Sequence, residues 1–202
     1  MSRSSPRILI ALAFVLGAAG CSSTKVVSRW ENPQYVPAHF NRILVIGVSR
    51  EASVRRAFED AFVARLKAEG VHAIPSYVVI PEEGQVDESR LQQATRQANA
   101  DAVLMTRLLR VERKTEVTSG YYSPPSAPLG PYPWYSDRWL GYYDPPQIYQ
   151  YDVYISETSL YDVRTNQLVW SGTVQTATPG DLNKEIQRYV ATVMKALKKA
   201  LA

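Results

Sequence analysis

The sequence has very little of the residues that build disulfide frameworks and metal centres. Its 202 residues include one cysteine and two histidines. One cysteine excludes an intramolecular disulfide framework and any zinc site that needs several thiolates. Two histidines leave little for a histidine-rich metal centre. We therefore expect neither a bound metal nor a cofactor.

Long hydrophobic runs are also missing. The most apolar segment, ILIALAFVL at Ile8–Leu16, is far shorter than the roughly 20 residues that a membrane-spanning helix needs. It follows Arg3 and Arg7 and precedes a stretch of small residues, which is the layout of a secretory signal peptide. Residues 1–20 are therefore expected to be a leader that is removed from the mature protein.

The single cysteine, Cys21, follows this leader directly. The sequence AAGC that ends at Cys21 resembles the lipobox of bacterial lipoproteins. This resemblance implies that the thiol receives diacylglycerol, that the leader is cleaved before Cys21, and that the new amino group is acylated, for example with palmitate. Ser22, in place of an aspartate, implies the inner leaflet of the outer membrane, facing the periplasm. The alternative is an ordinary cleavage site with an unmodified cysteine.

The chain has no strong excess of charge of either sign. Its formal net charge is +4, and removal of the leader leaves 21 Lys and Arg against 19 Asp and Glu. A balance of +2 is too small to indicate a nucleic-acid-binding surface. An envelope location argues against nucleic acid as well, so we expect no nucleic-acid partner.

Sequence motifs for catalysis are absent. The sequence contains no H-E-x-x-H, G-x-S-x-G, Walker or G-x-G-x-x-G pattern. His39 and His72 stand alone, and Ser49 lies where a strand meets a helix but outside any elbow pattern, so helix capping is its expected role. The sequence assigns no catalytic residue and no metal ligand, and we expect the protein not to be an enzyme.

Hydrophobic periodicity predicts an α/β domain that occupies residues 41–202 and faces the periplasm. Short apolar runs predict strands and a period near 3.6 residues predicts helices. We expect strands at 42–48, 71–74, 101–111, 151–163 and 168–178, and helices at 49–69, 87–99 and 181–202. The order predicts a mixed sheet of about five strands with three helices, with parallel crossovers first and an antiparallel hairpin after them. Residues 21–40 are expected to be a lipidated tether, partly packed as an edge strand.

A segment rich in proline and tyrosine, residues 119–150, interrupts this pattern. Seven of the thirteen prolines lie in it, which excludes a helix or a central strand and predicts an extended, irregular loop insertion. Its aromatic rings could lie partly on the sheet, stack on a protein or glycan partner, or rest at the membrane–water interface. The candidate partner-binding residues are Tyr121, Tyr122, Tyr132, Trp134, Tyr135, Trp139, Tyr142 and Tyr143.

Several sequence elements together resemble a group of uncharacterised bacterial envelope lipoproteins. They are Phe40–Val48, Arg55–Asp60, Gly70–Tyr77, Ala100–Leu104 and Leu160–Gly172. More distantly, the order of elements is similar to that of the amino-terminal domain of TolB and of the periplasmic domain of the curli-export lipoprotein. These relatives imply scaffolding and partner binding at the envelope rather than catalysis.

The sequence therefore predicts a lipid-anchored outer-membrane lipoprotein that acts as a non-catalytic binding or scaffold component of an envelope assembly. The expected partners are the membrane, through the anchor, and an envelope protein. The alternative is a module that binds peptidoglycan or another glycan through its aromatic loop.

Overall fold

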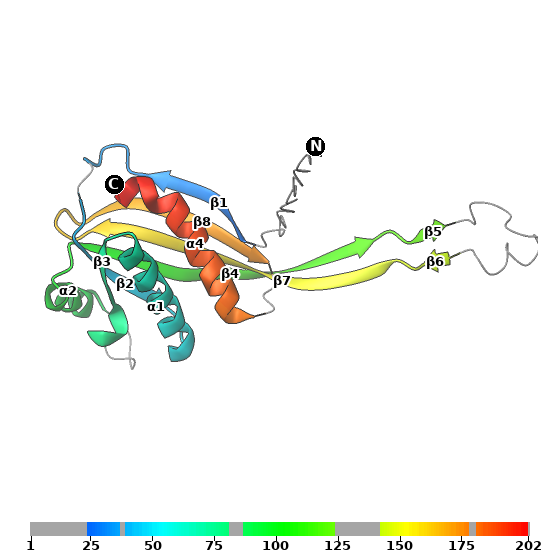
Figure 1. Cartoon of the computed structure of the whole chain (residues 1–202), viewed down its shortest axis with the longest axis horizontal. Coiled ribbons are helices and arrows are strands. Elements are labelled where there is room, and N and C mark those ends of the chain that lie inside the picture. Colours follow the sequence, from blue (N-terminus) through cyan, green and yellow to red (C-terminus); the bar gives the residue numbers. More distant parts are fainter. Residues whose placement is uncertain (1–23, 37–38, 81–86, 124–141, 178–180, 202) are drawn as a thin grey trace, which may run out of the picture.

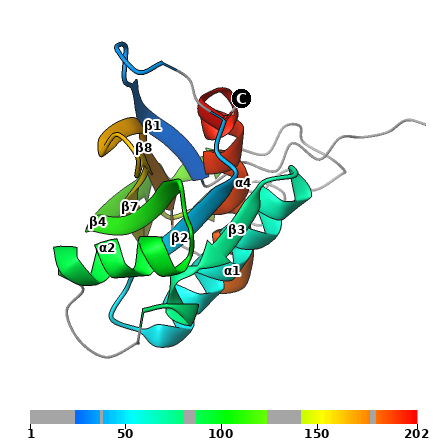
Figure 2. The same cartoon turned by 90° about the vertical axis from the view of Figure 1, so that its left-hand side faces the viewer.

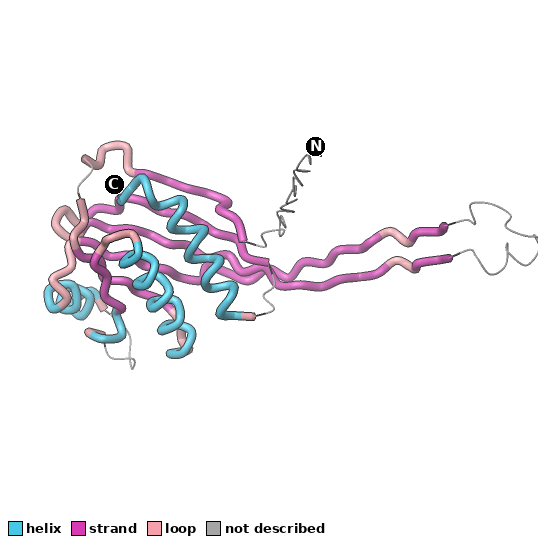
Figure 3. The backbone as a smooth tube through the Cα atoms, in the orientation of Figure 1, coloured by secondary structure: helices cyan, strands magenta, loops and turns pink. Residues whose placement is uncertain are grey.

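The computed structural model describes residues 24–36, 39–80, 87–123, 142–177 and 181–201. A twisted six-stranded sheet with helices on both faces forms the body of the protein. Two strands of this sheet continue out of the body as a long two-stranded arm (Figure 1 and Figure 3). The α/β class expected from the sequence is confirmed.

The sheet combines parallel and antiparallel pairing in the order β1-β8-β7-β4-β2-β3. Its parallel part pairs β2 with β3 and with β4, and its antiparallel part pairs β4 with β7, β7 with β8, and β8 with β1. The bounds are β1 Thr24–Glu31, β2 Arg42–Val48, β3 His72–Pro75, β4 Ala102–Thr118, β7 Gln147–Asp162 and β8 Gln167–Ala177. The parallel crossovers come first along the chain, as expected.

Among the described residues, three α-helices cover the sheet, and Figure 2 shows their arrangement. Helices α1 (Ala52–Ala68) and α4 (Leu182–Leu201) lie on one face, and α2 (Glu88–Gln97) lies on the other. A short 3-10 helix, η1 (Ser76–Val78), follows β3. Within the part of the chain that the structure describes, no helix is long and apolar enough to cross a membrane.

The helix ends follow local sequence signals. The Asp87 carboxylate accepts the backbone N–H of Arg90 at 2.8 Å and caps the start of α2. Gly70, just beyond the end of α1, has φ +83°, and Asn166 in the turn between β7 and β8 has φ +54°. Glycine and asparagine tolerate this left-handed backbone better than other residues do.

The central strand β2 has an unbroken apolar run because both of its faces are buried. Ile43 and Val45 pack against α1 and α4, whereas Leu44 and Ile46 belong to the smaller core beneath α2. Successive side chains of a strand point to opposite faces. A strand covered on both sides therefore loses the alternation that marks a half-exposed strand.

The strands that form the arm extend further than the sequence indicates. Strand β4 reaches Thr118 rather than Val111, and β7 begins at Gln147 rather than Tyr151. Within the segment expected to be an irregular insertion, β5 (Tyr121–Ser123) pairs with β6 (Tyr142–Asp144). A ribbon outside the body has no buried face, so its hydrophobic pattern carries almost no strand signal.

Part of the expected tether belongs to the sheet. Strand β1 pairs antiparallel with β8, and the backbone N–H of Asn32 donates to the Val169 carbonyl at 2.9 Å. The Tyr35 hydroxyl donates to the Asp162 carboxylate at 2.6 Å. The edge strand that the sequence suggested is therefore present, and it begins only three residues after Cys21.

The contact between Tyr35 and Asp162 makes the stability of the body depend on pH. Burial opposes ionisation of Asp162, but hydrogen bonds from Arg164, Tyr35 and the backbone outweigh it and lower its pKa. Burial and the bond to Asp162 raise the pKa of Tyr35 to about 12. The contact therefore contributes its full stabilisation of the folded state between about pH 4 and about pH 10, the ordinary pKa values of aspartate and tyrosine.

We expect Asp162→Asn to lower the free energy of unfolding near pH 7 by about 2 kcal/mol, because it weakens hydrogen bonds to a charged acceptor. The difference from the wild type should narrow as the pH falls below 4 and Asp162 becomes protonated in the native protein. Urea unfolding between pH 2 and 11 measures it. Tyr35→Phe should reduce the loss of stability above pH 10, and the loss that remains should come from other tyrosines with a raised pKa, such as Tyr189. If the free energies of unfolding of Asp162→Asn and the wild type differ by the same amount down to pH 2, this account is contradicted.

Candidate functional site

The most prominent surface feature is the arm, the paired segments of β4 from Leu108 to Thr118 and of β7 from Gln147 to Ser156. Strand β4 pairs with β2 only as far as Arg107, and β8 reaches β7 only from Val153 onward. In the described chain, the outer edges of β4 and β7 beyond these points have no strand partner. At about 3.3 Å per residue, the segment of β4 from Leu108 to Thr118 is roughly 35 Å long.

The arm consists of a polar ribbon that carries exposed apolar side chains. Arg113 pairs with Asp152 across the two strands at 3.1 Å, and the Tyr151 hydroxyl donates to Glu116 at 2.6 Å. Exposed ion pairs of this kind add little stability. Further out, Val117 lies opposite Ile148, and their side chains are 64% and 68% exposed. The arm therefore presents both apolar surface and free strand edges to solvent.

The structure places part of the predicted aromatic site at the end of the arm. Tyr121 is exposed, and Tyr122 lies opposite Tyr143 in the pairing of β5 with β6. Tyr142 lies opposite Ser123 in the same ribbon. These four tyrosines are therefore close together although about twenty residues separate the two strands. The other candidates, and the lipidation site, lie outside the described residues: Tyr132, Trp134, Tyr135, Trp139 and Cys21.

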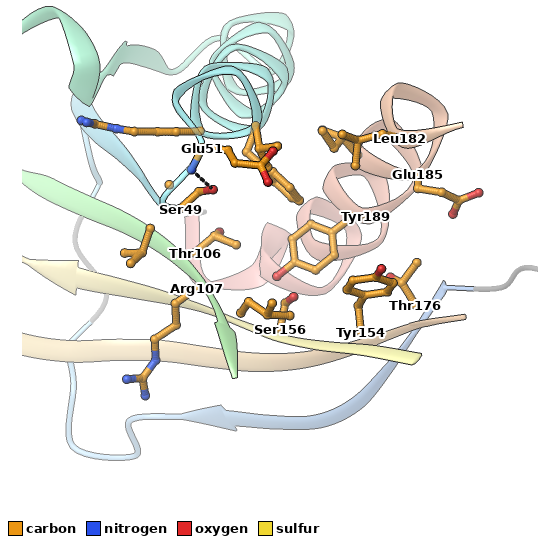
Figure 4. A pocket seen from close by; sticks show the side chains of 17 residues that line it. Ser49, Glu51, Thr106, Arg107, Tyr154, Ser156, Thr176, Leu182, Glu185 and Tyr189 are labelled. Carbon is orange, nitrogen blue, oxygen red and sulfur yellow. Dashed lines mark hydrogen bonds between the residues drawn. The ribbon is translucent and has the colours of Figure 1, made fainter. Parts of the chain in front are cut away.

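A cavity of about 330 Å³ lies at the base of the arm. It is bounded by the first turns of α1 and α4, by the end of β2, and by the sheet where β4, β7 and β8 meet (Figure 4). Its walls are mainly apolar, and its volume is near the lower end of the range for small-molecule sites. The apolar side chains that line it are Val48, Val54, Phe58, Leu108, Leu182 and Ile186.

Three hydroxyl groups at the inner wall of the cavity bind one another. In Figure 4, Tyr189 of α4 points toward Thr106 and Ser156 of the sheet. Its hydroxyl lies 2.8 Å from that of Thr158, which in turn lies 2.8 Å from that of Thr106. Burial raises the pKa of Tyr189 to about 12. Tyr189 therefore stays neutral at physiological pH and acts as a fixed hydroxyl at the inner wall of the cavity.

The two arginines that border the cavity are held in ion pairs. Arg55 binds Glu59 at 3.0 Å, and Arg107 binds Glu157 at 2.8 Å. In Figure 4 the side chain of Arg107 points away from the cavity. Because carboxylates already neutralise both guanidinium groups, neither offers a cavity ligand a free positive charge.

Behind Arg55, a buried hydrogen-bond network ties α1 to the sheet. Glu59 is 1% exposed, and one carboxylate oxygen accepts the Gly47 N–H at 2.9 Å and the Ser76 hydroxyl at 2.6 Å. Its other oxygen accepts the Tyr77 N–H at 3.0 Å. With Arg55 this carboxylate has four partners, which is the condition for burying a charge.

Sequence reasoning missed the cavity and the Glu59 network. Glu59 occupies an apolar position of an otherwise amphipathic helix, which was the available signal. No comparable signal marks the cavity, because its lining comes from six separate elements. Ser49 accepts the Glu51 N–H at 3.1 Å just before α1, while Glu51 itself is the N-cap residue. Among the described residues, no group of three or more His, Cys, Asp or Glu could hold a metal ion.

Comparisons with known proteins give fold neighbours only. No family model and no curated protein matches the chain. The PelC dodecamer structure from Paraburkholderia phytofirmans matches at 14% identity and TM-score 0.48, over 86% of this chain and 96% of that one. The lipoprotein GNA1162 from Neisseria meningitidis matches at 14% identity and TM-score 0.42, over 78% and 98%. Similarities this low assign neither a family nor a function.

Proposed function

We propose that this protein is a lipid-anchored outer-membrane lipoprotein, facing the periplasm, that serves as a non-catalytic binding or scaffold component of an envelope assembly. The arm is the element that contacts the partner protein. One observation carries this proposal: a two-stranded ribbon leaves the body, and among the described residues the outer edge of β4 has no strand partner beyond Arg107 and that of β7 has none before Val153. Free strand edges are templates for pairing with another chain.

The side chains of the arm support the same function. Val117 and Ile148 are exposed on the ribbon and contribute nothing to either hydrophobic core of the body. When a partner adds a strand to a free edge, main-chain hydrogen bonds provide the affinity and side-chain contacts provide the specificity. Exposed β-branched residues beside the edge can make those side-chain contacts. The position of β1, three residues after Cys21, supports an anchor at the base of the arm.

A second candidate function is binding of peptidoglycan or another glycan by the aromatic residues. The observation that favours it is the register of β5 and β6, which sets Tyr122 opposite Tyr143. Neighbouring tyrosines offer flat, amphipathic rings at low entropic cost. This function would use the end of the arm, whereas strand addition would use its edges.

Shortening the arm tests the proposed function. Thr118 and Gln147 are register partners, so an Asn-Gly turn can replace residues 119–146 and close the ribbon. We expect Tm to change by less than about 3 °C, because neither hydrophobic core includes the described residues of this segment. A photoreactive residue at Tyr149 should crosslink to a discrete partner in intact cells, and the shortened variant should keep that adduct because it retains the free edges of β4 up to Thr118 and of β7 from Gln147.

Tyr161, which is exposed on the body, is the matched control position and should give no such adduct. Sedimentation with purified peptidoglycan distinguishes the glycan function. If that function is correct, the wild type should bind peptidoglycan, the shortened variant should not, and Tyr149 should form no protein adduct. Equal crosslinking from Tyr149 and Tyr161 would contradict the proposal. Collapse of Tm on shortening would show that the arm is part of the folded core.

A further inference from the structure

We propose that the cavity at the base of the arm holds one acyl chain, the chain carried by Cys21. This inference rests on the lipid anchor of the proposed function and extends it by assigning the chain a site on the protein. It starts from three half-exposed aliphatic side chains, Val48, Leu108 and Leu182, which all line the cavity. Exposed apolar groups around an apolar cavity indicate an apolar occupant.

The position of β1 brings the anchor to the cavity. The Thr24 hydroxyl lies 3.4 Å from that of Thr176, and Thr176 lines the cavity. Thr24 is three positions after Cys21 in the chain, and an extended chain spans at most about 3.5 Å per residue. The acylated cysteine is therefore within about 10 Å of Thr24, and an acyl chain is long enough to cover that distance.

The charges around the cavity favour an attached acyl chain over a free fatty acid. Glu51 belongs to the lining, and its carboxylate would repel the head group of a fatty acid, whereas Glu185 is held in an ion pair with Arg188. Arg55 and Arg107, the two cations of the lining, are already paired with Glu59 and Glu157. An acyl chain joined to Cys21 by a neutral ester or amide bond has no head-group charge to satisfy.

The hydroxyl groups of the cavity are also compatible with an acyl chain. Tyr189, Thr158 and Thr106 form a continuous chain of hydrogen bonds. An apolar ligand therefore leaves these three groups with their hydrogen-bond partners. The volume of about 330 Å³ suits a single chain, so the remaining chains of the anchor stay in the membrane. Two chains are enough for stable anchoring.

Photocrosslinking from the lipid tests this assignment on the full-length protein in its native membrane. Cells are fed a diazirine-bearing fatty acid, which lipoprotein processing attaches to the N-terminal cysteine, and the irradiated protein is digested and analysed by mass spectrometry. We expect adducts between the lipopeptide and the peptides of α1 and α4 that contain Phe58 and Leu182. Val48→Trp, which narrows the cavity mouth, should reduce these adducts by roughly fivefold or more.

The matched control is Val78→Trp, because Val78 is 65% exposed, Val48 is 55% exposed, and only Val48 lines the cavity. The control should leave the adducts unchanged. Both valines are on the surface, so both variants should fold, and Tm confirms that. Equal adduct yields from the two variants would overturn the proposal.

The other outcomes distinguish failure of the cavity assignment from failure of the lipid anchor on which it rests. An N-terminal peptide without acyl mass, together with a Cys21→Ala variant that fractionates like the wild type, would overturn the anchor and this inference with it. An acylated peptide that crosslinks only to membrane lipid would leave the anchor standing and overturn the assignment. A third outcome is that photoreactive fatty acid added to the Cys21→Ala protein forms adducts at the cavity, while the lipid on Cys21 of the wild type forms none. The occupant of the cavity would then be a free lipid, and the assignment to Cys21 would be overturned.

Discussion

Replacing Glu59 with alanine is expected to lower the free energy of unfolding by about 3–5 kcal/mol, because it removes one partner of a buried ion pair. Arg55 would lose its carboxylate, and the backbone N–H groups of Gly47 and Tyr77 would lose their acceptor. For a protein of this size the corresponding decrease in Tm is roughly 10 °C. Urea unfolding and differential scanning calorimetry measure both quantities.

Asp60→Ala is the matched control for this prediction. Asp60 is the next residue of α1, and its carboxylate accepts a hydrogen bond from the Tyr77 hydroxyl at 2.6 Å, but it is exposed. Its removal should cost less than about 1 kcal/mol. Similar losses for Asp60→Ala and Glu59→Ala would show that the buried network is not what joins α1 to β2 and η1. Glu59→Gln, which keeps the size but not the charge, should be intermediate.

The second large effect is expected from Gly172→Ala in β8. The indole of Trp170 is fully buried and lies across Gly172, and a Cβ at residue 172 would come within 2.3 Å of the indole ring. One added methyl group must therefore displace the largest side chain of the core. Overpacking of this kind costs about 1–3 kcal/mol and occasionally more. Thermal unfolding measures the loss.

Trp170→Phe in the same chain tests the cause of that loss. The smaller ring should free the space that the new methyl group needs, so the double variant should be more stable than the sum of the single effects indicates. Ser171→Ala serves as the control, because Ser171 lies between these two residues and its side chain points to the opposite face of the strand. Strict additivity of Gly172→Ala and Trp170→Phe would refute the proposed clash.

The body of the fold could be predicted from the sequence because its segments are either fully buried or strongly amphipathic. The apolar run of β2, the stripe of α4 and the left-handed Gly70 each carry a local signal that the structure follows. The order of elements and the change from parallel to antiparallel pairing follow from short connections between them. Prediction succeeded where burial of apolar side chains stabilises the segment.

The arm could not be predicted because burial does not stabilise it. Residues 112–118 read as polar, and the prolines that follow argue against a strand. Pairing of Val117 with Ile148 and of Arg113 with Asp152 depends on partners more than thirty residues away. Such cross-strand contacts become visible only when the register is known.

Among the candidate sites, too, a local motif could be predicted from the sequence and a site assembled from distant segments could not. A modification motif such as the one at Cys21 is local, so a single sequence is enough to suggest it. The cavity combines residues from Gly47 to Tyr189, and no single segment of the lining carries a periodicity that marks it. Glu59 is spaced with Phe62 and Leu66 along the helix, but its charge assigned it to the solvent-exposed face, and its four partners, from β2, α1 and η1, emerge only from the fold.

The pairing of β1 with β8 also sets an order of events during folding. Thr24 and Thr176 are 152 residues apart in the chain yet meet in adjacent strands. The first strand of the sheet therefore has no neighbour until β8, near the other end of the described chain, is in place. Contacts of such long range slow folding. Strands β2, β3 and β4 can assemble much earlier, and the N-terminal strand joins the sheet only after β8 has been made.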